Sequence, residues 1–127
     1  MLNKDFSKFG KHFQENLVQI MFEDRAFCDQ VGEVFKVEFL EQKYLQQFVE
    51  KLFDYKEKYQ THPSSQAIAT ILRTELDESN QVLTKQVREF FARIHANPSV
   101  EDEEYVKHTS LDFCRKQKLK EALMKSA

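Results

Sequence analysis

Glycine and proline are scarce in this sequence, with two of each among its 127 residues. At average usage the two residue types make up about 12% of a protein, so a chain of this length would hold about 15 of them. Few positions are therefore available for tight turns and for left-handed backbone. A β-sandwich or β-barrel needs a turn about every 8–12 residues, so this scarcity argues against both classes.

A strong net charge and a long apolar run are also missing. The 19 Lys and Arg residues nearly balance the 21 Asp and Glu residues, which gives a net charge of -2 and a sequence pI near 6.1. We therefore expect weak or no direct nucleic acid binding and no attraction to a membrane. No apolar stretch approaches the roughly 18 residues of a membrane span, and residues 1–22 are too charged for a signal peptide.

Cysteine is rare as well. Cys28 and Cys114 lie far apart in the sequence and form no CxxC motif. This arrangement is typical of reduced thiols rather than of a disulfide framework. Together with the missing signal peptide, it predicts a cytoplasmic protein.

Apolar residues instead recur at spacings of three and four, the pattern of amphipathic helices. The sequence predicts helices over about residues 7–22, 27–35, 40–59, 64–76 and 83–96. The third has the widest apolar stripe, about 220°, and is expected at the centre of the bundle. It should stop near Gln60, because His62 precedes a proline, and Ser64 or Ser65 should cap the next helix. We predict an all-α fold, a compact bundle of five to six helices with a protruding C-terminal helix.

The last predicted helix, residues 102–125, has two different apolar faces. Ser99 and Asp102 form a capping-box pattern before it, and acidic residues precede a basic second half. One face holds Val106, Ser110, Phe113 and Cys114, and a rotated face holds Leu119, Ala122 and Leu123. Such a helix is expected to contact two surfaces, the second of which need not lie in this chain. A solvated helix end remains the simpler interpretation of its basic half.

Motifs for catalysis or cofactor binding are missing. The sequence has no GxxxxGK[ST] or GxGxxG loop and no HExxH or Cys/His zinc spacing, so we predict no enzyme activity, no cofactor and no metal. His62 as a general base, Cys114 as a reactive thiol, and Glu104 with His108 as metal ligands are possible on residue type alone. Each has a simpler structural explanation as a helix-end, core or surface residue.

Several segments together resemble the N-terminal domain of DnaB-type replicative helicases, in particular the version in T-even phages. The resemblance covers about residues 7–126. The residues that carry it are Gln14-Glu15-Asn16-Leu17 through Phe27, Glu38-Phe39-Leu40, Tyr44, Phe48, Leu52, Lys58-Tyr59, His62-Pro63-Ser64-Ser65 and Phe113-Cys114-Arg115-Lys116.

This resemblance implies one helical domain, residues 1–127, with a globular head over 7–96 and a partner-facing helix over 99–127. The last helix would be the first arm of a helical hairpin, and the second arm, a linker and the ATPase motor would follow Ala127 in a longer protein. The expected function is that of a non-catalytic collar, which helps to assemble a hexameric replicative DNA helicase and contacts primase or a helicase loader.

The expected partner interface lies on the last helix, and self-association as a dimer, or as a hexamer in the longer protein, is expected to use it. Its predicted residues are Phe113, Arg115, Lys116, Leu119, Ala122, Leu123 and Met124. An alternative with the same fold is a stand-alone small helical adaptor or phage regulatory protein that binds a replication partner.

Overall fold

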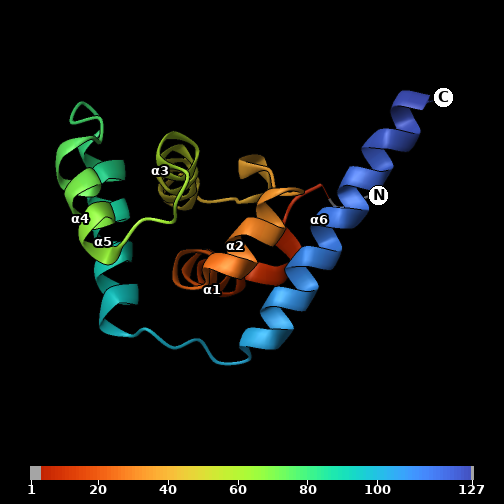
Figure 1. The fold of residues 1–127 in the computed structure, drawn as a ribbon, viewed down its shortest axis with the longest axis horizontal. Helices are drawn as coiled ribbons and strands as arrows, with labels where there is room; N and C mark the ends of the chain where they lie inside the picture. The colour runs from red at the N-terminus through yellow and green to blue at the C-terminus, as the bar shows by residue number, and fades with distance from the viewer. Residues whose placement is uncertain (1–3, 127) are drawn as a thin grey trace.

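The apolar stripes of the sequence form six α-helices in a computed structural model, which describes residues 4–126 and contains no strand within that range (Figure 1). The helices are α1 (Gly10–Glu23), α2 (Arg25–Gly32), α3 (Lys43–Tyr59), α4 (Ser65–Thr74), α5 (Gln81–Ala96) and α6 (Glu103–Ser126). Two short 3₁₀ segments, η1 (Ser7–Phe9) and η2 (Val37–Phe39), precede α1 and α3. The prediction of an all-α bundle is confirmed.

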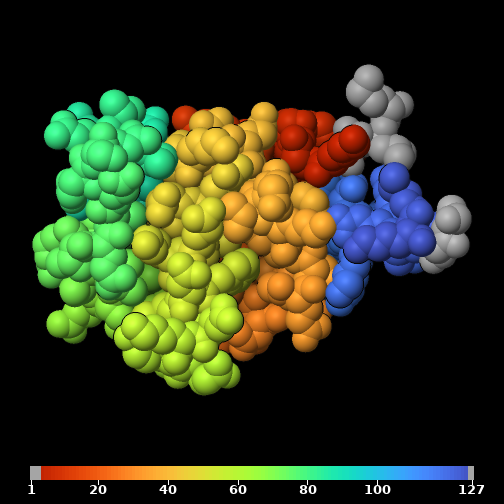
Figure 2. Space-filling model, turned by 90° about the horizontal axis from the view of Figure 1, so that it is seen from above, coloured from red at the N-terminus to blue at the C-terminus, as the bar shows by residue number. Residues whose placement is uncertain are grey.

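Helix α3 lies in the middle of the bundle, as its wide apolar stripe predicts. Helices α4 and α5 pack on one side of it, α1 packs on the other, and α6 covers α1 and α2 at the far side (Figure 1). Phe48 and Leu52 of α3 are completely buried. The C-terminal part of α6 projects from the body of the molecule (Figure 2).

Both ends of α3 follow from local chemistry. The helix begins at Lys43 rather than at Leu40, which is buried but belongs to the preceding extended segment. It ends where Gln60 adopts a left-handed conformation with φ 56°. The Oγ atom of Ser64 then accepts a hydrogen bond from the Ala67 N–H at 3.1 Å, which makes Ser64 the cap of α4.

Two further predictions about helix ends are wrong. Helix α2 ends at Gly32, so Phe35 packs into the core from the following irregular segment rather than from a helix. The expected capping box before α6 is not formed, because Ser99 lies in irregular chain and Asp102 has a φ of 55°. Helix α6 begins only after that turn, at Glu103.

A buried glutamine joins the N-terminal segment to the loop before α3. The Gln14 side-chain amide donates hydrogen bonds to the carbonyl oxygens of Phe6 and Gly10 and to the Glu41 carboxylate. Its oxygen accepts from the Glu41 backbone N–H at 2.9 Å. Gln14 is completely buried, and these bonds satisfy its polar atoms. The segment before α1 is thereby held against the bundle where α6 packs.

Candidate partner-binding surface on helix α6

The first half of α6 belongs to the core. Val106, Ser110 and Cys114 are buried, and the Ser110 hydroxyl donates a hydrogen bond to the Val106 carbonyl at 2.6 Å. Burial raises the pKa of the Cys114 thiol to about 12. This thiol is therefore protonated at neutral pH and is a packing residue rather than a nucleophile.

Phe113 is also a core residue and is removed from the predicted partner interface. Its ring lies 4.6 Å from that of Phe6 and 5.5 Å from that of Phe39, measured between centroids, and it is 8% exposed. The N-terminal segment that carries Phe6 is far away in the sequence, so helical spacing alone does not reveal this aromatic cluster.

The second half of α6 leaves the bundle. An ion pair between Glu121 and Lys36 links this half to the head, beside a 3.4 Å hydrogen bond from the Lys118 ammonium to the Glu33 carbonyl. The remaining predicted interface residues lie at the surface. These are Arg115, Lys116, Leu119, Ala122, Leu123 and Met124, of which Leu119, Leu123 and Met124 are 60%, 63% and 76% exposed.

These exposed residues do not form a single patch. An α-helix turns by about 100° per residue, so Leu119 and Leu123 share one face, which points away from the core stripe of Val106. Met124 is aligned with the core stripe instead, and it is exposed because the helix has passed the end of the head. The predicted interface residue Met124 therefore lies on the Val106 side of the helix and not on the face of Leu119. We call Leu119 and Leu123 the outer leucine pair.

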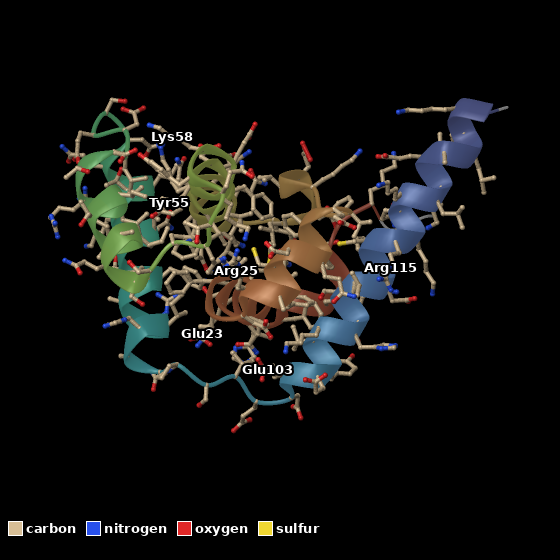
Figure 3. The ribbon with its side chains drawn as sticks, viewed as in Figure 1. Glu23, Arg25, Tyr55, Lys58, Glu103 and Arg115 are labelled. Carbon is tan, nitrogen blue, oxygen red and sulfur yellow. The ribbon has the colours of Figure 1, made fainter. Side chains whose placement is uncertain are left out.

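The two ends of α6 differ in charge. Glu103 and Glu104 occupy its first turn, close to the end of α1 that carries Glu23 (Figure 3). Burial raises the pKa of Glu23, and the neighbouring Glu103 adds to that shift. Lys107 offsets part of this negative charge through an ion pair of 2.6 Å with Asp24.

Positive charge follows in the second half. Arg115, labelled on α6 in Figure 3, and Lys116 are exposed one turn before Leu119. Lys116 pairs with Asp112 at 3.0 Å, and both side chains are more than half exposed. The outer leucine pair thus lies in a basic and solvated part of the helix.

A hollow between α3 and α4 offers aromatic side chains. It has a volume of about 510 Å³ and is lined by residues that include Tyr55, Lys58, Tyr59 and Ile71. Tyr55 and Lys58 are labelled beside it in Figure 3. The sequence pattern assigns both tyrosines to the core stripe, yet Tyr59 is 55% exposed. Lysine and carboxylate side chains both line this hollow, so its chemistry selects no particular ligand.

The other residues considered as site candidates have structural surroundings. His62 is held between the Phe22 carbonyl and the Lys56 ammonium, at the junction of α1, α3 and α4. Glu104 and His108 line a shallow hollow against α2, and Glu104 lies 3.7 Å from Lys107. Within residues 4–126, no group of three or more His, Cys, Asp and Glu side chains is placed to hold a metal ion.

Comparison with known proteins gives this chain no relative: no protein-family model, no curated protein and no solved structure matches it. Within the part of the chain that the structure describes, none of the helices has the length and apolar character needed to cross a membrane.

Proposed function

We propose that this chain is the non-catalytic collar domain of a hexameric replicative DNA helicase. In this proposal the head, residues 7–96, is a rigid platform, and α6 is the first arm of a hairpin through which subunits assemble. The domain would also contact primase or a helicase loader. The observation that carries the proposal is the form of α6, which is seated in the core by its first half and leaves the bundle with two leucines exposed.

The arrangement suits a docking domain. Phe113 and Cys114 fix the helix on the head, so the projecting part has a defined direction. It therefore loses little conformational entropy when a partner binds. Exposed leucines four residues apart are the usual anchors of helix-to-helix recognition. The resemblance of the segments named in the sequence analysis to the N-terminal domain of DnaB-type helicases favours the same assignment.

A stand-alone adaptor with the same fold is the second candidate, because the same α6 surface would serve it equally well. The sequence of the coding region beyond residue 127 separates the two. A linker followed by GxxxxGK[ST] is expected for the helicase, since that loop holds the nucleotide phosphates. A stop codon directly after Ala127 would contradict the collar proposal and favour the adaptor.

Assembly provides a second test. The isolated chain should show a weak monomer–dimer equilibrium in light scattering, since only one arm of the proposed hairpin is present. In the longer protein, Leu119→Asp with Leu123→Asp should prevent hexamer formation while circular dichroism stays helical. Normal hexamers from the double variant would show that α6 takes no part in assembly.

A further inference from the structure

The outer leucine pair has cations for neighbours and no acid. On a helix, the side chains next to Leu119 on the same face are those three and four residues away, which include Arg115 and Lys116. For Leu123 the corresponding neighbours include Lys120. Over residues 115–126 the sequence holds five Lys or Arg and one Glu. That acid, Glu121, is turned toward the head and pairs with Lys36.

These cations are available to a partner. Arg115 and Lys120 have no ion-pair partner within residues 4–126. Lys116 has the exposed Asp112, and an exposed pair of this kind contributes little and exchanges readily. A molecule that covers the leucines therefore meets three positive side chains with little competition from the chain itself.

A second copy of α6 fits this surface poorly. Two-fold pairing centred on Leu119 and Leu123 would bring the Arg115, Lys116 and Lys120 side chains of both copies to the same seam. Like charges facing each other across an interface oppose association. Nucleic acid also fits poorly, because the patch has leucines at its centre and no aromatic side chain on which a base would stack.

We infer that the outer leucine pair docks an amphipathic helix whose apolar stripe is bordered by Asp or Glu side chains. Its apolar residues would cover Leu119 and Leu123, and its carboxylates would reach Arg115, Lys116 and Lys120. This inference rests on the proposed function only in placing a partner on α6. It adds the charge of that partner, and it implies that direct α6-to-α6 contact is the weaker association.

The test uses the full chain and two synthetic peptides of about 14 residues, long enough for four helical turns. Both carry leucine at positions i, i+3, i+4 and i+7, and one has Glu where the other has Lys. Fluorescence anisotropy should show binding of the Glu peptide, weakened when salt is raised from about 50 to about 500 mM. Leu119→Asp with Leu123→Asp should reduce its affinity by at least about tenfold.

A charge-reversed variant makes the test specific. Arg115→Glu with Lys120→Glu should exchange the preference, so that the Lys peptide becomes the tighter ligand. Lys43→Glu with Lys85→Glu changes the same amount of charge at exposed positions on α3 and α5, and it should leave the preference unchanged. Equal binding of both peptides, or an unchanged preference in the charge-reversed variant, would overturn the inference.

Two further outcomes would identify another occupant and also overturn it. If a second copy is the occupant, light scattering of the chain alone would show a dimer that the leucine variant abolishes and that forms at concentrations as low as those at which the Glu peptide binds. A single-stranded oligonucleotide would displace the Glu peptide and still bind the leucine variant, if the surface is a phosphate site. The reading frame after Ala127 tests the helicase assignment separately, so the two proposals can fail independently.

Discussion

The Nδ1 atom of His62 accepts a hydrogen bond from the Lys56 ammonium at 3.3 Å, while its Nε2 donates to the Phe22 carbonyl at 2.5 Å. The ring is therefore neutral and fixed in one tautomer. Asp29 binds the same ammonium, and Arg25 lies 3.8 Å from Asp29. This set of side chains connects α1, α2 and α3 to the turn before α4.

The first prediction concerns pH. Burial lowers the pKa of His62 from its usual 6.5, and the Lys56 charge adds to that effect. The unfolded chain therefore binds a proton on His62 before the folded chain does. The stability from this residue is fully present above about pH 6.5 and is lost as pH falls toward the lowered folded pKa. Thermal melts between pH 7.5 and 5 should show this loss.

The matched variant for that experiment is His62→Gln, which keeps a side-chain amide near the Phe22 carbonyl but does not titrate. Its melting temperature should change less over the same pH interval. The carboxyl pKa values lowered by hydrogen bonds, such as that of Asp24, act only at more acidic pH. A parent protein whose melting temperature is constant from pH 7.5 to 5 would show that His62 does not act in this way.

The second prediction concerns the buried amide of Gln14. Gln14→Met keeps the length of the side chain but removes the partner of the Glu41 N–H and one of the two donors to the Phe6 carbonyl, which still accepts from the Phe9 N–H. We expect a loss of about 1–3 kcal/mol in the free energy of unfolding, the usual cost of an unsatisfied buried polar group. Urea melts measure it. Gln81→Met, at an exposed position, is the control, and equal effects of the two substitutions would contradict the assignment.

The third prediction separates the two halves of α6. Phe113→Ala should cost about 3–5 kcal/mol, because it empties a closely packed aromatic site. Leu119→Asp with Leu123→Asp should change the free energy of unfolding by no more than about 0.5 kcal/mol per position, because both side chains are mostly exposed. If the double variant is as destabilised as Phe113→Ala, then the outer leucine pair belongs to the core.

The fourth prediction concerns the two thiols. Cys28 and Cys114 are completely buried, and burial raises their pKa values to about 11 and about 12. A thiol reagent such as DTNB should therefore modify neither residue in the folded protein on the timescale of minutes, and both should react fast in denaturant. Rapid modification of either cysteine in the native protein would indicate that the helix carrying it opens readily.

The helices were predictable because helical periodicity and caps are local properties. The extent of α5 and the cap at Ser64 follow from residues within one or two turns. The start of α6 was not predictable in the same way, because no residue type in this segment indicates the left-handed backbone at Asp102. A serine three residues before an acidic residue has the capping-box pattern whether or not the chain bends there.

The candidate site was predictable only in part, for a similar reason. Spacing on α6 separates Leu119 from Val106, because both belong to one helix. Helical spacing does not show that Phe113 packs against Phe6, and it does not show that Met124 lies beyond the end of the head. Both features depend on other segments of the chain. The role of Gln14 also depends on distant residues, so a polar side chain on the border of an apolar stripe gave no signal of it.

The packing of Phe6 on Phe113 has a consequence for the order in which the molecule forms and opens. This contact joins the beginning of the described chain to its last helix, so nearly all of the chain separates its two partners. Contacts that close such long loops form late in folding, because the chain loses the entropy of loop closure before the contact can stabilise the fold. Helix α6 should therefore be the last helix to dock on a growing chain and the first to detach from a finished one. A partner that holds α6 in place would thus also slow the exposure to water of the aromatic cluster of Phe6, Phe39 and Phe113.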